Sequence, residues 1–201
     1  MNFLLRIAAY IFHPLFMPLL GVGTYFVVTP RYTEPQFMMA KMYAVIIITI
    51  FIPLVSYFLL RSLGIVKSIH LSDIAERKYP LMAQCLLILL LMKMVFKPYD
   101  DPELYYFFVG ILFTTMTALI LVFFSFKISL HQMAIAGVTM FIIGLSIHFQ
   151  INLIYTMAFF FFVNGLVATS RLHTKSHTYP ELIGGFFIGV IPQLILFSYW
   201  L

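Results

Sequence analysis

Long apolar runs separated by short polar segments follow one another along the whole chain. A helix that crosses a bilayer needs roughly 20 mostly apolar residues, and in lipid only helices and closed barrels satisfy every backbone hydrogen bond. The runs are continuous, whereas barrel strands would alternate apolar and polar residues. The pattern therefore predicts an all-α, polytopic transmembrane helical bundle of six to seven spans, a single integral membrane domain over residues 1–201.

Seven segments have the apolar character of a span. We expect them at about 3–28, 40–63, 79–96, 103–126, 127–147, 152–169 and from 181 onward. Each internal proline removes a helical hydrogen bond. The first segment should therefore be kinked, or split into a re-entrant pair, at His13-Pro14 and Pro18, and the second should be interrupted at Pro53.

Polar residues gather in three of the connections between these spans. The connections lie between the second and third spans, between the fourth and fifth, and between the sixth and seventh. An even number of crossings separates any two of them, so all three should face the same side of the membrane and could form one site. The acidic turn at Asp100, Asp101 and Glu103 falls on the other side.

The composition supports a membrane protein and argues against a nucleic-acid partner. Of the 201 residues, 63% are hydrophobic and 9% are charged, and the mean hydropathy is +1.03. The net charge of +5 comes from basic residues placed singly or in pairs near span ends, without a soluble basic module. Membrane lipids are the expected partners of these residues.

The third polar connection carries the densest set of reactive side chains. Ser170 and Arg171 are followed by His177 and then by Glu181. This spacing resembles Ser-Arg-x5-His-x3-Asp, the third motif of the type 2 phosphatidic acid phosphatase superfamily, with Glu in place of Asp. The segment Ile128-Ser129-Leu130-His131 keeps the serine and histidine of that family's Pro-Ser-Gly-His motif but has neither its proline nor its glycine.

The family's first motif, Lys-x6-Arg-Pro, is matched least well. Counting back from Arg77 places His70 where the lysine belongs, and Lys78 stands where the proline belongs. The resemblance extends over roughly residues 67–189, within a motif-bearing core of about residues 61–201. It implies the fold of a type 2 phosphatidic acid phosphatase and a membrane enzyme that hydrolyses a lipid phosphate or diphosphate, in the inner (plasma) membrane of a bacterium.

The resemblance also implies a role for each matching side chain. His177 would attack phosphorus and form a phosphohistidine, Glu181 would hold its ring, and His131 would protonate the leaving group. Neither a metal nor another cofactor is needed in this scheme. The residues expected to bind the substrate phosphate are Arg171, Arg77, Ser129, Ser170, His70 and Lys127.

Other readings of the same residues stay open at this point. Basic residues at span ends usually bind lipid headgroups. The altered motifs would also suit a transferase, or an inactive relative that binds lipid phosphates. Alternatively, His173 and His177 are four residues apart, so on a helix they could present two nitrogens to zinc, with His131 and Glu181 nearby, in a metal-dependent membrane hydrolase.

Overall fold

The computed structural model describes residues 2–66 and 74–201, and within these ranges every regular element is helical. Four of the described helical segments are long and apolar enough to cross a membrane. They are Pro35–Ser62, Pro102–Phe123, Leu130–His148 and Tyr179–Tyr199. The chain is thus a polytopic helical membrane protein.

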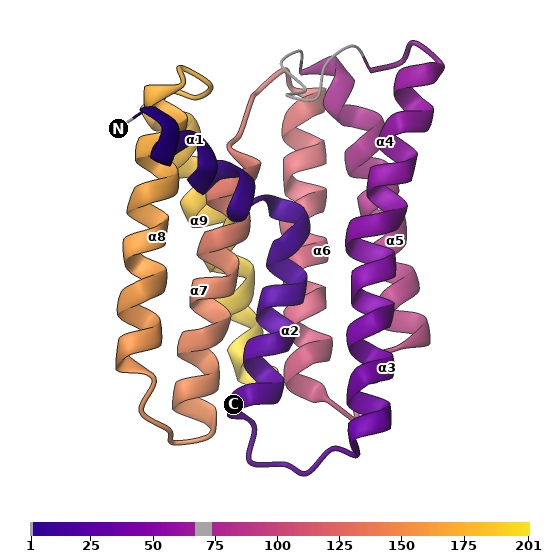
Figure 1. Ribbon diagram of the computed structural model, residues 1–201, viewed down its shortest axis with the longest axis vertical. Coiled ribbons are helices and arrows are strands. Elements are labelled where there is room, and N and C mark those ends of the chain that lie inside the picture. Colours follow the sequence, from indigo (N-terminus) through magenta and orange to yellow (C-terminus); the bar gives the residue numbers. More distant parts are fainter. Residues whose placement is uncertain (1, 67–73) are drawn as a thin grey trace.

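The first segment divides where its prolines predict. Helix α1 (Asn2–Ile11) ends before His13, a 3-10 turn follows over η1 (Pro14–Phe16), and α2 (Met17–Val28) continues from it. Helix α1 lies obliquely across the upper end of α8 (Ile154–His173), whereas α2 runs along the bundle (Figure 1). The break brings residues 9–18 to one end of the bundle.

The second segment is one helical column whose winding changes before Pro53. It consists of α3 (Pro35–Ile46), a π-helical turn η2 (Ile47–Phe51) and α4 (Ile52–Ser62). Proline cannot donate to the carbonyl four residues earlier, and a π-helical turn accommodates this mismatch. The predicted interruption is therefore a local change of helix type.

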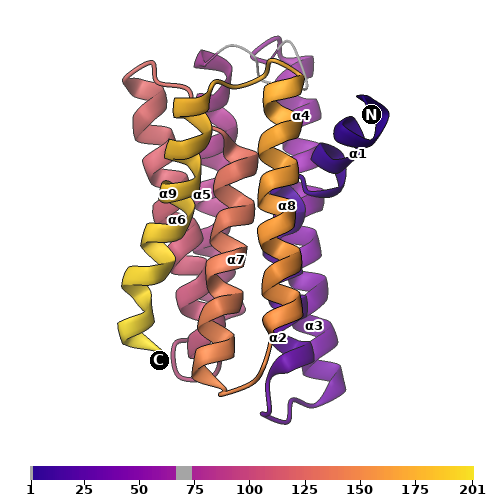
Figure 2. The same cartoon turned by 90° about the vertical axis from the view of Figure 1, so that its left-hand side faces the viewer.

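The remaining helices run alongside one another in Figures 1 and 2. They begin with η3 (Ala75–Arg77) and α5 (Lys78–Met94), and then continue as α6 (Pro102–Phe123), α7 (Leu130–His148), α8, α9 (Tyr179–Leu196) and η4 (Phe197–Tyr199). The chain between α6 and α7 and the chain between α8 and α9 lie at the same, upper end in Figure 1. This is the arrangement that counting crossings predicts.

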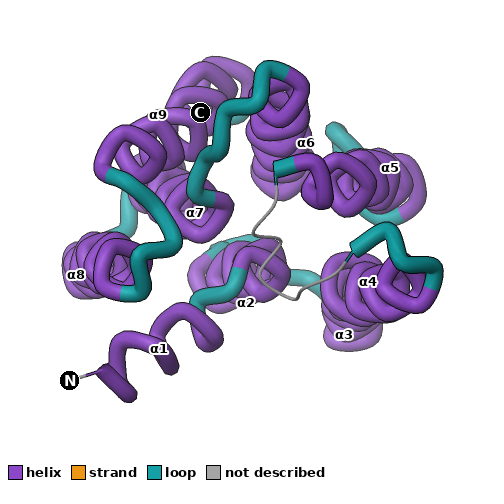
Figure 3. Tube along the Cα trace, turned by 90° about the horizontal axis from the view of Figure 1, so that it is seen from above, coloured by secondary structure: helices purple, strands orange, loops and turns teal. Residues whose placement is uncertain are grey.

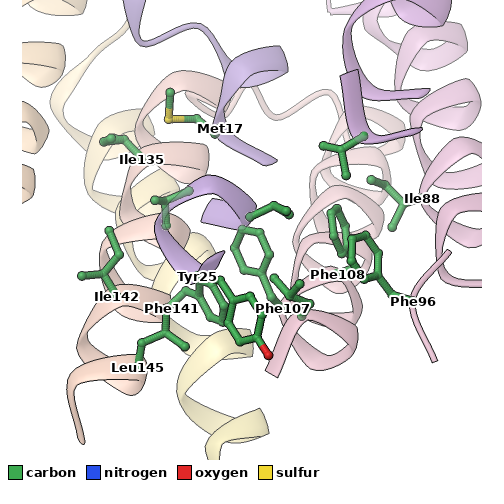
Figure 4. Close-up of a cluster of buried hydrophobic side chains, with 14 of the residues drawn as sticks. Met17, Tyr25, Ile88, Phe96, Phe107, Phe108, Ile135, Phe141, Ile142 and Leu145 are labelled. Carbon is green, nitrogen blue, oxygen red and sulfur yellow. The ribbon is translucent and has the colours of Figure 1, made fainter. Parts of the chain in front are cut away.

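Helix α7 is the most buried candidate span and packs against α2, α8 and α9 (Figure 3). Gly189 allows α9 to approach closely, because a Cβ added there would lie 2.2 Å from the Met133 carbonyl oxygen of α7. The main core extends from this contact toward α2 and α6, where the Phe107 and Phe141 rings stack with centroids 4.2 Å apart, beside Tyr25 (Figure 4).

The lower end of the bundle holds a buried acidic group with matched partners. The Glu103 side chain is fully buried, and its Oε1 lies 2.8 Å from Arg31 Nη2 and 2.9 Å from His148 Nε2. Asp101 pairs with Lys41. The acidic turn predicted for this side is therefore largely neutralised by basic groups from other elements.

Candidate functional site

A cavity of about 1080 Å³ extends from the upper end of the bundle into its interior. Its wall comes from the α1–α2 segment, α4 to α9 and the chain between them. Among the residues that line it are four basic or imidazole side chains from three different connections or helix ends: Arg77, Lys127, Arg171 and His177. We call these four residues the cationic cluster.

His177 is held by the first turn of the following helix. Its Nδ1 lies 2.6 Å from Glu181 Oε2, and the side chain of His177 is 6% exposed. Glu181 also accepts a hydrogen bond from the backbone N–H of Thr178, within a capping box that begins α9. With Nδ1 donating to the carboxylate, Nε2 of His177 is left for a ligand.

The surroundings of His177 favour its neutral form. Burial lowers the pKa of the imidazole most, the hydrogen bond that His177 donates to Glu181 raises it, and the nearby charges of Arg77 and Lys127 lower it further. The net direction is downward, so His177 is uncharged at neutral pH. Its Nε2 then carries a lone pair.

The cations of the cluster are themselves partly removed from water. Arg77 is 5% exposed and donates from Nη1 to the Ile128 carbonyl at 2.9 Å, and Lys127 Nζ donates to the Ser176 carbonyl at 2.9 Å. Burial lowers the pKa of both side chains, and the charge of Arg77 lowers the pKa of Lys127 further, while Glu181 acts in the opposite direction on each.

No aspartate or glutamate is among the residues found to line the cavity in the part of the chain that the structure describes. Arg171 Nε is buried and has no hydrogen-bond partner among those residues. Lys175 adds a further basic side chain to the wall. Among the described lining residues, basic side chains therefore predominate at the upper end of the cavity.

Two histidines lie on the α1 side of the cavity. The His131 Nε2–H donates to the Ala9 carbonyl at 3.2 Å, while His13 Nδ1 accepts the Leu15 N–H at 3.3 Å. Their ring centroids are 5.1 Å apart. The structure thus brings His131 and His177, which are predicted to share a site, to one cavity.

Two of the predicted phosphate-binding residues do not line the cavity. Ser129 is the N-cap of α7, where its hydroxyl accepts the Gln132 N–H, and Ser170 donates its hydroxyl to the Leu5 carbonyl of α1. Serines near helix ends commonly serve the backbone in this way. His70 lies outside the described residues.

The zinc-site alternative is wrong in its geometry. Helix α8 ends at His173, and residues 174–178 are not helical, so His173 and His177 do not share a helix face. Within residues 2–66 and 74–201, no group of three or more His, Cys, Asp or Glu is placed to hold a metal. A metal-dependent hydrolase is not supported.

The sequence reading missed the polar groups deeper in the cavity. Gln193 of α9 is 1% exposed, and its Nε2 donates to the Phe107 carbonyl at 3.0 Å. Its Oε1 accepts no hydrogen bond from the described residues. Pro192 leaves the Ile188 carbonyl without its helical donor, and the Thr114 hydroxyl lies 3.4 Å from that carbonyl oxygen. The sequence signal that could have identified Gln193 is an amide side chain next to a proline inside an apolar run.

Comparison with known families assigns the chain differently from its motifs. The model of the family described as "Mntp: Putative manganese efflux pump" matches residues 36–196. No curated protein and no solved structure matches the chain.

The match overturns the resemblance to the type 2 phosphatidic acid phosphatases and the lipid phosphatase function that it implied. The same correction applies to the lipid phosphate substrate, the phosphohistidine chemistry and the transferase or inactive forms of that family. Two of the three motifs are incomplete, and in the third Ser170 binds α1 while Glu181 caps α9. Because the family match extends from α3 to α9, the chain belongs to the manganese efflux pump family.

Proposed function

We propose that this protein is a membrane transporter that exports Mn²⁺ from the cell. The proposal rests on the family match over residues 36–196. This range covers nearly all residues of the four candidate spans. An exporter of cytosolic ions acts in the plasma membrane, which is the inner membrane of a bacterial cell. We place the chain there.

The proposed topology includes the helices beside the four candidate spans. Helix α8 has 20 residues, and a helix of that length extends over roughly 30 Å, the thickness of the hydrocarbon core. Helices α5 and α2 are shorter and run parallel to it (Figure 1). We count α2, α5 and α8 as crossings, which gives seven spans and keeps the three polar connections on one side.

The cavity supplies a route into the bundle for a hydrated ion. Carboxylate, carbonyl and water oxygens are the ligands that suit Mn²⁺. The deep wall offers neutral oxygens, namely the amide of Gln193 and the hydroxyls of Thr114 and Thr115. With no carboxylate found among the described residues of that wall, an ion would keep part of its water shell. Such weak binding is compatible with transport, because an ion that must leave the site cannot be bound too tightly.

Gln193 is the side chain best placed to contact the ion. Its buried Oε1 has an unused acceptor site, and its position is fixed by the bond to the Phe107 carbonyl and by the absence of a side chain at Gly110. A Cβ at Gly110 would lie 2.3 Å from Gln193 Nε2. The amide is therefore oriented before an ion arrives.

The test is Mn²⁺ flux through purified protein in liposomes, measured with a manganese-quenched dye. Gln193→Leu keeps the volume and removes the oxygen, and we expect it to lower the flux about tenfold, the loss of one ion contact. Gln36→Leu, at the exposed start of α3, is the matched control and should leave the flux unchanged. Equal Mn²⁺ flux in the parent and in Gln193→Leu would remove Gln193 from the pathway.

A further inference from the structure

We propose that the ring of Phe107 is the closed gate between the cavity and the lower end of the bundle. The inference rests on the proposed function, because it concerns the path of an ion that has reached Gln193. The residues that line the cavity extend down to Pro18 on α2, Phe107 on α6 and Val138 on α7. In the part of the chain that the structure describes, no residue of α6 before Phe107 and none of α7 after Val138 is found in the wall. The cavity thus ends at the Phe107 ring.

Aromatic side chains from three helices fill the bundle at this level. The Phe107 ring stacks on Phe141 of α7, with centroids 4.2 Å apart and an interplanar angle of 21°. Its edge lies against the backbone of α2, because a Cβ added at Gly21 would be 2.4 Å from Phe107 Cζ. Tyr25, one turn further along α2, lies beside the two rings (Figure 4). Tyr25, Phe107 and Phe141 are each at most 1% exposed, and we call these three residues the aromatic floor.

The aromatic floor interrupts the polar path through the bundle. Above it, Gln193 and Thr114 offer neutral oxygens to an ion, and Gln193 Nε2 donates to the carbonyl of Phe107 itself at 3.0 Å. The proposed ion contact therefore lies directly beside the gate. An ion that entered the layer of rings would lose water without gaining ligands, which is costly. Hydrophobic constrictions close channels in this way.

A polar group lies one helical turn below the aromatic floor. Glu103 precedes Phe107 by four residues on α6, and its Oε2 accepts hydrogen bonds from Arg31 at 3.1 Å and from the Tyr25 hydroxyl at 3.4 Å. Its Oε1 lies 2.9 Å from Nε2 of His148 at the end of α7. Arg31 is 46% exposed, so this group reaches the surface at the lower end. The aromatic floor thus separates the cavity from a polar group that continues to the opposite side.

The contacts of Glu103 also hold the gate closed. They join α6 to α7 and to the chain that follows α2, and these are the helices that the Phe107 ring packs against. Arg31 can be hydrated when it leaves Glu103, because it is already half-exposed. Loosening of these contacts would let the three helices separate and the ring turn aside. The present arrangement, open above and closed below, corresponds to one state of alternating access.

The experiment measures the conductance of planar lipid bilayers that contain the purified full-length protein, in potassium chloride without Mn²⁺. Phe107→Ala removes the ring and should raise the conductance at least about tenfold over the parent protein. Phe108→Ala is the matched control. Phe108 is adjacent and equally buried, but it stacks on Phe96 and is not among the residues found to line the cavity. Phe108→Ala should therefore conduct like the parent.

A milder pair of variants covers the case in which Phe107→Ala does not fold. Phe107→Leu keeps an apolar side chain but fills less of the space against Gly21 and Phe141, so it should conduct more than Phe108→Leu. Equal conductance of the Phe107 and Phe108 variants, whether high or low, would overturn the gate. Mn²⁺ flux through the parent is measured separately. A parent that moves no Mn²⁺ would contradict the proposed function without changing the conductance result.

Discussion

Both ends of the bundle carry buried charged side chains, but at the lower end they pair with one another and at the upper end they line a cavity. At the lower end, Glu103 is paired with Arg31 and His148, and Asp101 with Lys41. At the upper end, the cationic cluster surrounds a cavity without a carboxylate in its described wall. Charges paired with one another inside the chain leave little capacity for a ligand, whereas the basic side chains of the upper end line an open cavity. The comparison separates a structural polar group from a binding site, although both stand out equally in the sequence.

The largest expected effect is at the paired end. Glu103→Ala would leave His148 and Arg31 facing a buried space without an acid, and breaking such a pair costs ~3 kcal/mol of unfolding free energy. Arg31 is 46% exposed, so part of this cost will be recovered by hydration. Urea unfolding in micelles measures it. Asp100→Ala, at an exposed position in the same turn, should be nearly neutral, and equal losses would show that the pairing is not what stabilises this end.

The second largest effect is expected at Gly110, which lies against the cavity residue Gln193. Gly110→Ala would place a Cβ 2.3 Å from Gln193 Nε2, and such overpacking costs about 2 kcal/mol of stability. Displacing the amide should also reduce Mn²⁺ flux. Gly165→Ala, where an added Cβ meets nothing within 4 Å, is the control. If Gly110→Ala transports like Gly165→Ala, the amide does not need its present orientation.

Ser129 sharpens the comparison at the upper end, since it was predicted to bind phosphate. In the structure its hydroxyl caps α7, so Ser129→Ala should cost about 1 kcal/mol of stability. The free energy of unfolding, measured with urea in micelles, checks this. A variant as stable as the parent would show that the cap does not stabilise α7.

The smallest effect is the pH dependence of the upper end. Folding lowers the pKa of His177, so the unfolded chain binds a proton more readily. The stability that this provides is present above the ordinary histidine pKa and is lost as the pH falls below it toward the folded pKa. Arg77 and Lys127 oppose protonation, while Glu181 favours it.

The parent should therefore lose more stability on acidification from pH 7 to 5 than His177→Gln does. Melting curves across this range test the expectation. Identical pH profiles for the two proteins would mean that His177 does not titrate as its surroundings require.

Much of the fold follows from local pattern, because apolar length and proline position act over a few residues. The break at His13-Pro14 and the altered winding before Pro53 were both predictable. The meeting of Arg77, Arg171, His131 and His177 at one cavity followed from counting crossings. Four of the described helical segments are long and apolar enough to cross a membrane, and the predicted count of six to seven spans is not shown by length and composition.

The function could not be predicted from local sequence pattern. Ser170 bonds to Leu5, which is 165 positions away in the sequence, and no local pattern foretells that partner. Glu103 is in a polar turn but is buried by Arg31 and His148 from other elements. The motif spacing around His177 also satisfies a helix cap, so spacing alone pointed to the wrong family.

The most direct measurement is Mn²⁺ movement by the purified protein without other components. Liposomes containing the protein should take up or release Mn²⁺ down an imposed gradient faster than empty liposomes, and faster than liposomes containing Gln193→Leu. Mn²⁺ movement equal to that of empty liposomes, under gradients of either direction, would contradict the assignment of this chain as a manganese exporter.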